Sequence, residues 1–183
     1  MKEKKVLFIF IIYLIVLIIS PKRYLWYLPS IPIYSNNEDE ADIVNKLTKE
    51  RNINDIDFFK KTDKSVSYAF LEHVDETLGE LDLIIQKIVP IILFFKYTIN
   101  RARPYQINKN IIKLESTTDK TPSYPAGHAC QAYYLSKVLS KKYPNKKKIF
   151  EDIAEKCDLV RIKAGIHYKS DGIFSKKIVD YLI

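Results

Sequence analysis

Two helix-compatible segments of similar length flank one turn in the C-terminal half of the chain, and this arrangement restricts the fold more than any other feature. Residues 129–143 contain neither proline nor glycine, Pro144-Asn145 follows as a turn signal, and residues 145–161 again contain neither. At 1.5 Å per residue, the first helix would be about 22 Å long and the second about 24 Å. We therefore expect an antiparallel helix pair in which Arg161 returns to the level of His128.

The rest of the chain also favours helices. Hydrophobic residues make up 47% of the 183 residues and charged residues 28%, an ordinary globular balance, with no alternating strand pattern and no internal repeat. Helices are expected at 38–51, at 54–61, at 67–78 with an end near Gly79, and from about Asp171 onwards. Apolar residues 81–100, interrupted at Pro90, read as a central buried helix or helix pair, and 105–121 as a polar loop. The sequence predicts an all-α, compact helical bundle.

The N-terminus carries an apolar run from Val6 to Ile19, preceded by lysines and followed by aromatic and basic residues up to position 28. As a helix this run spans about 21 Å, short of the ~30 Å hydrocarbon core of a membrane. Ser20-Pro21 is a poor cleavage site, so an uncleaved anchor is preferred over a cleaved signal or a buried core helix. We expect a membrane anchor or signal helix at 1–28, a linker at 29–37 and one domain at 38–183.

Charge and cysteine content limit the function classes. The formal net charge is +8, which suits an anionic membrane surface, an anionic substrate or nucleic acid. No zinc-finger spacing, RNA-binding aromatic motif or helix-turn-helix is visible, so nucleic acid is not expected as a partner. The two cysteines, Cys130 and Cys157, fit no metal motif and require no disulfide. More lysines and arginines precede the apolar run than follow it, which favours an extracytoplasmic or lumenal domain.

Residues 123–128, Ser-Tyr-Pro-Ala-Gly-His, lead from a turn into the first helix of the pair. His128 therefore stands at a helix N-terminus, where free N–H groups and the helix dipole favour an anion. A histidine beside an anion is a candidate acid, base or nucleophile. By itself, such a stretch is more often a helix cap or a packing feature than a functional site.

Three short segments carry the unusual residues. The first runs from Lys96 to Arg103-Pro104 with six residues between them, the second is Pro125-Ala126-Gly127-His128, and the third runs from Arg161 to Asp171 through His167. Each has a structural alternative, because cations at a helix end complement the dipole and a His/Asp pair four residues apart can lie on a surface.

Together these segments resemble the signature of the phosphatidic acid phosphatase type 2 and vanadium haloperoxidase superfamily. That signature is Lys-x6-Arg-Pro, Pro-Ser-Gly-His and Ser-Arg-x5-His-x3-Asp, and the match covers roughly residues 96–171. Two positions depart from it: Ala126 replaces the first serine and Val160 the second. The loss of the first hydroxyl removes one donor to a phosphate oxygen, worth about 1–3 kcal/mol.

The resemblance implies a role for each matching residue. His167 would be the nucleophile that forms a phosphohistidine, Asp171 would fix its tautomer, and His128 would be the acid and then the base. The phosphate would be bound by Lys96, Arg103, Arg161 and the backbone N–H of Gly127. No metal and no cofactor are implied, and vanadate is expected to inhibit as a phosphate analogue. Arg101 could rim the site or be a solvent cation, and His73 is expected to be structural or exposed.

The implied function is a metal-independent phosphatase on phosphomonoesters or lipid phosphates. An anchor within residues 6–28 would favour a lipid phosphate, whereas a single span is more similar to the acid-phosphatase branch than to the integral lipid phosphatases. One alternative is a non-catalytic, membrane-tethered anion-binding protein, which Ala126 motivates. Another is a vanadate-dependent haloperoxidase, although those enzymes are much larger.

Overall fold

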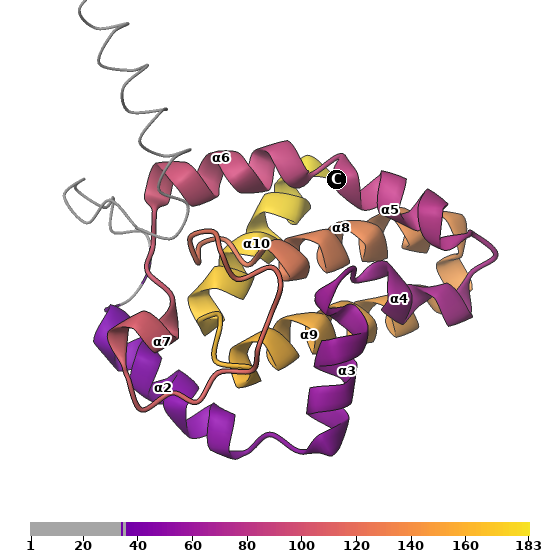
Figure 1. Cartoon of the computed structure of the whole chain (residues 1–183). Helices are drawn as coiled ribbons and strands as arrows, with labels where there is room; N and C mark the ends of the chain where they lie inside the picture. Colours follow the sequence, from indigo (N-terminus) through magenta and orange to yellow (C-terminus); the bar gives the residue numbers. More distant parts are fainter. Residues whose placement is uncertain (1–33, 35) are drawn as a thin grey trace, which may run out of the picture.

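The structure, a computed structural model, describes Tyr34 and residues 36–183, and every regular element in this part of the chain is a helix (Figure 1). The predicted all-α class is therefore confirmed for the described residues. Among them, no helix has both the length and the apolarity needed to cross a bilayer. The predicted anchor at 1–28, and the predicted linker at 29–37 except for Tyr34, Asn36 and Asn37, lie outside the described residues.

The elements follow the chain in a simple order. They are α2 (Asn37–Lys49), α3 (Ile53–Asp63), α4 (Ser67–Phe70), the 3₁₀ turn η1 (Leu71–His73), α5 (Leu78–Gln86), α6 (Val89–Ile99), α7 (Pro104–Ile107), α8 (Gly127–Lys142), the 3₁₀ turn η2 (Pro144–Lys146), α9 (Lys147–Lys163) and α10 (Lys169–Leu182). The long connection between α7 and α8 corresponds to the predicted polar loop.

The pair formed by α8 and α9 is the centre of the molecule (Figure 1). Small residues on α8 allow the close approach: Ala129, Cys130 and Ala132 are all buried and belong to the main apolar cluster. Helices α5, α6 and α10 pack against α8, and α2 and α3 pack against α9. The predicted antiparallel pair is confirmed, and its lysine-rich turn is exposed at the end away from His128 and Arg161.

Two predicted helices differ from the observed ones. The expected helix 67–78 ends early, and Gly79 lies in the first turn of α5 instead of ending a helix. The reason is a capping box, in which the Thr77 side chain accepts from the Glu80 N–H and the Glu80 side chain accepts from the Thr77 N–H, so that a new helix starts there. The apolar stretch 81–100 is a helix pair, α5 and α6, but it is peripheral: Leu83 and Phe94 are exposed.

Two glycines adjust the path of the chain into α10. Gly165 has a φ of +79°, and a side chain there would also meet Ile111, so this glycine ends α9 sharply. Gly172, in α10, faces α9: a Cβ at this position would lie 2.0 Å from Oδ2 of Asp158. The buried Asp158 carboxyl therefore lies directly against the backbone of α10, one residue after Asp171.

Candidate active site

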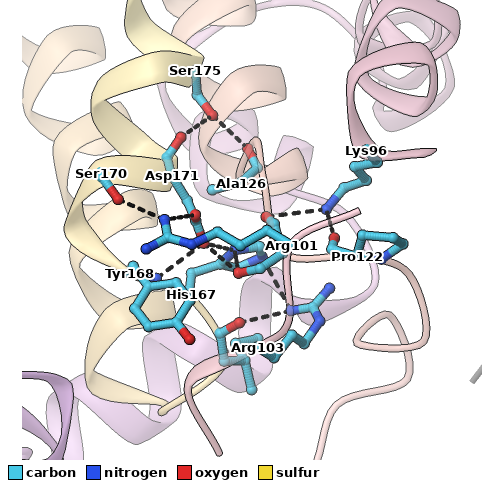
Figure 2. A network of polar contacts seen from close by, with 12 residues as sticks. Lys96, Arg101, Arg103, Pro122, Ala126, His167, Tyr168, Ser170, Asp171 and Ser175 are labelled. Carbon is cyan, nitrogen blue, oxygen red and sulfur yellow. Dashed lines mark hydrogen bonds and ion pairs between the residues drawn. The ribbon is translucent and has the colours of Figure 1, made fainter. Parts of the chain in front are cut away.

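His167 lies between α9 and α10 and is held by the first turn of α10. Its Nδ1 is 2.9 Å from Oδ2 of Asp171, and the same oxygen accepts from the backbone N–H of Tyr168 at 3.0 Å (Figure 2). An ionised carboxylate only accepts, so Nδ1 carries the proton and donates it to Asp171. The lone pair of the neutral imidazole is therefore on Nε2.

Arg103 stands on the Nε2 side of His167. Its Nη1 is 3.2 Å from His167 Nε2 and also donates to the backbone oxygen of Ile166 at 2.8 Å, while its Nε donates to that of Thr121 at 2.9 Å. Arg103 lies at the start of α7, where Pro104 opens the helix. A phosphorus atom approaching Nε2 would thus meet a guanidinium group at the same point.

Lys96 reaches the same region from α6. Its ammonium donates to the backbone oxygens of Pro122 and Ser123. Its Cε would lie 3.6 Å from a Cβ placed on Gly127, so the lysine runs alongside the first turn of α8. No side chain caps that turn, since Ala126 is the N-cap residue.

Burial and charge set the protonation states of this cluster. Burial and the nearby Arg103 lower the pKa of His167 to about 3, so the imidazole is neutral at ordinary pH. Burial, again with Arg103, also holds the pKa of Lys96 well below its usual range. Burial alone would raise the pKa of Asp171, but the hydrogen bond from His167 and the charge of Arg101 keep it below its ordinary value.

Arg101 is a buried support of Asp171 and neither a rim residue nor a solvent cation. Its Nη1 is 2.7 Å from Oδ1 of Asp171 and 2.6 Å from the hydroxyl of Ser170. Its guanidinium lies 3.7 Å from the ring centre of Tyr168, and Glu40 of α2 is 3.4 Å from its Nη2. Arg101 therefore neutralises the oxygen of Asp171 that His167 does not use.

His128 and Arg161 meet at Asp63, the last residue of α3. Nε2 of His128 is 2.9 Å from the backbone oxygen of Asp63, and Nη1 of Arg161 is 3.2 Å from its Oδ1. Nη2 of Arg161 donates to the hydroxyl of Thr62 at 2.8 Å. Burial, followed by the charge of Arg161, holds the pKa of His128 well below its ordinary range, and a charge on His167 would lower it further.

The structure brings all seven predicted site residues into two adjoining groups. Lys96, Gly127, Arg103, His167 and Asp171 form the first, and His128 and Arg161 form the second. Five of their side chains are almost fully enclosed: Lys96 is 4% exposed, Arg103 1%, Arg161 0%, His167 3% and Asp171 0%. The Lys96 ammonium and the Arg103 Nε donate to backbone oxygens of the α7–α8 loop, whereas Arg103 Nη1 donates to Ile166 and Arg161 donates to Asp63 and Thr62.

Three polar residues in this region were not predicted as site residues. The Ser123 hydroxyl donates to Oδ2 of Asp171 and lies 3.4 Å from Nδ1 of His167, on the side away from Arg103. Asp63 and Thr62 bind Arg161. Ser123 could have been suspected, because it directly precedes the Tyr-Pro-Ala-Gly-His motif, whereas α3 has no comparable signal.

The two departures from the superfamily signature are both buried. Ala126 is fully enclosed, and its backbone oxygen accepts from the hydroxyl of Ser175. Val160 packs with Phe59, Ala164 and Ile166 in a separate apolar cluster. A serine at 126 would therefore stand at the N-cap of α8, and a serine at 160 would stand in an apolar environment.

A scan against protein-family models gives no match for this chain, and a search of curated proteins gives none either. Among the described residues, no group of three or more His, Cys, Asp or Glu side chains could hold a metal ion. The absence of a metal requirement stays a prediction.

Proposed function

We propose that the chain is a metal-independent phosphatase that acts on phosphomonoesters or lipid phosphates through a phosphohistidine at Nε2 of His167. One observation carries this proposal: Nδ1 of His167 bonds Asp171 at 2.9 Å, while its Nε2 is 3.2 Å from the guanidinium of Arg103. The lone pair of the nucleophilic nitrogen and a guanidinium group that can bind phosphate therefore lie next to each other.

In the first step, Nε2 attacks phosphorus and the bond from phosphorus to the ester oxygen breaks. His128 gives its proton to that oxygen, and the alcohol leaves. Burial and the charge of Arg161 keep the pKa of His128 low. A phosphate dianion near Arg161 offsets that charge and raises the pKa of His128, which then takes from solvent the proton that it donates. In the second step, His128 takes a proton from water, the oxygen of that water attacks phosphorus, and the bond to Nε2 breaks.

The cations provide the electrostatic part of catalysis. In the transition state, negative charge is spread over the three equatorial oxygens of the transferring phosphoryl group. These oxygens can be bound by Arg103, Arg161 and Lys96. In the structure, these donors bind backbone oxygens and the Asp63 carboxylate. The substrate phosphate would take over the positions of these oxygens.

A second candidate is a non-catalytic anion-binding protein on the same scaffold. The observation that favours it is Ala126, which offers no hydroxyl at the start of α8. A vanadate-dependent haloperoxidase is a third and weaker candidate, and bromide oxidation with vanadate and peroxide would identify it.

Phosphate release by the purified full chain in detergent, with EDTA present, tests the proposal. Substrates are p-nitrophenyl phosphate, phosphatidic acid and a polyprenyl diphosphate, and His167→Ala is the blank. Phosphate release that is unaffected by EDTA but lost in His167→Ala supports the proposed phosphatase function. The substrate that is hydrolysed fastest then indicates the substrate class. A folded protein that binds vanadate and releases no phosphate from any substrate would favour the anion-binding candidate.

A further inference from the structure

The outer side of α5 and α6 carries large apolar side chains that are exposed. Leu83 is 63% exposed and Phe94 is 64% exposed, and between them lie Pro90 and the partly exposed Leu93. We refer to these four residues as the apolar ridge. Phe95, the neighbour of Phe94, turns inward and packs edge-on against Phe174 of α10 at 5.2 Å between ring centres, so Phe94 is left outside the core.

Charge is absent from the exposed side of α6. The only charged residue in the helix is Lys96, which is buried and bound to the α7–α8 loop. The nearest exposed charge before the helix is Lys87, which is basic. An uncharged apolar face on α6 with a lysine before it suits the interface of a bilayer with anionic lipids, and the exposed Glu80 of α5, three residues before Leu83, ends this uncharged face.

The connection to the N-terminal apolar segment limits how far α6 can be from a membrane. The described chain begins at Tyr34, whose ring lies 3.9 Å from the guanidinium carbon of Arg101, and Arg101 follows the end of α6 by two residues. Five residues separate position 28 from Tyr34, and the six Cα–Cα steps between them span at most about 20 Å. If residues 6–28 are in a membrane, the C-terminal end of α6 therefore stays close to its surface.

We propose that the apolar ridge on α5 and α6 lies in the interfacial layer of a lipid bilayer, with Lys87 at the level of anionic headgroups. The inner side of α6 carries Lys96, so the cation cluster would lie about 10 Å, one helix diameter, from the headgroups. A lipid phosphate could then enter the site without leaving the membrane. This last consequence rests on the proposed phosphatase function, whereas the docking itself does not.

Depth-dependent quenching of a single tryptophan tests the docking without any measurement of turnover. The full chain is prepared with Trp26→Phe, which removes its one tryptophan. Phe94→Trp then places a probe on the apolar ridge. Ile112→Trp is the matched control, because Ile112 is 77% exposed on the α7–α8 loop. Both proteins are reconstituted in phosphatidylcholine–phosphatidylglycerol vesicles with or without brominated acyl chains.

Docking predicts blue-shifted emission and several-fold stronger bromine quenching for Phe94→Trp than for Ile112→Trp. Equal quenching of the two probes, or quenching of neither, would overturn the proposal. A blue shift of the Phe94→Trp probe without bromine quenching would also overturn it, because the ridge would then be covered by protein, either residues 6–28 or a second copy of the chain. Quenching is read separately from phosphate release, so an inactive protein can still support or reject the docking.

Discussion

Oδ1 of Asp63 lies 3.2 Å from Nη1 of Arg161, across 98 positions of sequence. The same carboxylate accepts from the Ser116 hydroxyl and the Thr117 N–H of the α7–α8 loop. The backbone oxygen of Asp63 binds His128 at 2.9 Å. One residue at the end of α3 thus joins the loop, the arginine and the histidine, and under the proposed function its carboxylate would compete with a phosphate oxygen for Arg161.

Asp63→Asn should make phosphate binding tighter and should lower the free energy of unfolding of the protein without a bound anion. The variant loses the negative charge opposite the buried Arg161, a loss of about 3–5 kcal/mol for a broken buried pair. A bound phosphate or vanadate then restores the missing charge. Thermal unfolding with and without vanadate measures both effects, and the shift caused by vanadate should be larger in the variant. The same shift in both proteins would mean that Asp63 does not compete with the anion.

His128→Ala should reduce kcat/KM more for an alkyl phosphate than for p-nitrophenyl phosphate. An alkoxide needs a proton from His128 as it leaves, a contribution of roughly 10²–10⁴, whereas p-nitrophenolate leaves without one. His167→Ala should remove turnover of both substrates, because the nucleophile itself is lost. Steady-state kinetics on the two substrates give the comparison. An equal loss of kcat/KM for both would remove His128 from the leaving-group step.

Arg101→Met should destabilise the fold strongly although Arg101 touches no proposed substrate atom. The change leaves the Asp171 carboxylate buried without its 2.7 Å partner, which costs about 3–5 kcal/mol. Lys137→Met is the matched control, since the Lys137–Asp180 pair is half-exposed and is worth about 0–1 kcal/mol. Urea unfolding of both variants provides the test. Similar losses in the two would mean that Arg101 does not support Asp171.

Asp158→Asn should change the pH dependence of stability. The Tyr133 hydroxyl is 3.1 Å from Oε2 of Glu155 and 3.3 Å from Oδ2 of Asp158, yet it has only one proton to donate. The second contact is favourable only if one carboxyl is protonated. Burial, together with the charges of Asp171 and Glu155, raises the pKa of Asp158 to about 7, although Tyr133 and Lys176 act in the opposite direction.

The sign of this effect follows from proton binding. Between about pH 4 and pH 7 the folded protein holds a proton on Asp158 that the unfolded chain has released. This group therefore makes the free energy of unfolding fall as the pH rises through that window. Relative to wild type, Asp158→Asn should be more stable at pH 8 than at pH 5, as measured by urea midpoints at the two values. A stability difference that does not vary with pH would show that Asp158 is ionised throughout.

Ala126→Ser should preserve or raise activity and stability. A serine at this N-cap can accept from a free N–H in the first turn of α8, worth about 1 kcal/mol, and it can give its hydroxyl to a phosphate oxygen. Phosphate release and the unfolding temperature are the measurements. A large loss of activity would mean that the site is shaped around alanine.

Sequence reasoning predicted the elements whose signals are local or regularly spaced. Proline-free and glycine-free runs on either side of Pro144-Asn145 gave the central helix pair, and the length of the two helices placed Arg161 beside His128. The start of α5 was missed, although the capping-box pattern Thr77-Leu78-Gly79-Glu80 is a local signal that could have indicated it.

The contacts that complete the site could not be read in the same way. Asp63 is one of several acidic residues in a short amphipathic helix, and only packing against α9 brings it to Arg161. The sequence left Arg101 as either a residue at the rim of the site or a solvent cation, because the partners that enclose it come from α2 and α10. Such contacts join residues tens of positions apart, for which no periodic pattern exists.

The contact between Gly172 and the Asp158 carboxyl provides a marker for finding relatives of this chain. A side chain at 172 would collide with that carboxyl, so an aspartate at 158 requires a glycine at 172. Thirteen positions separate the two, and Arg161, His167 and Asp171 fall between them. A search pattern that adds this linked pair to the Arg-x5-His-x3-Asp motif would separate chains with the same helix packing from those that share only the short motif.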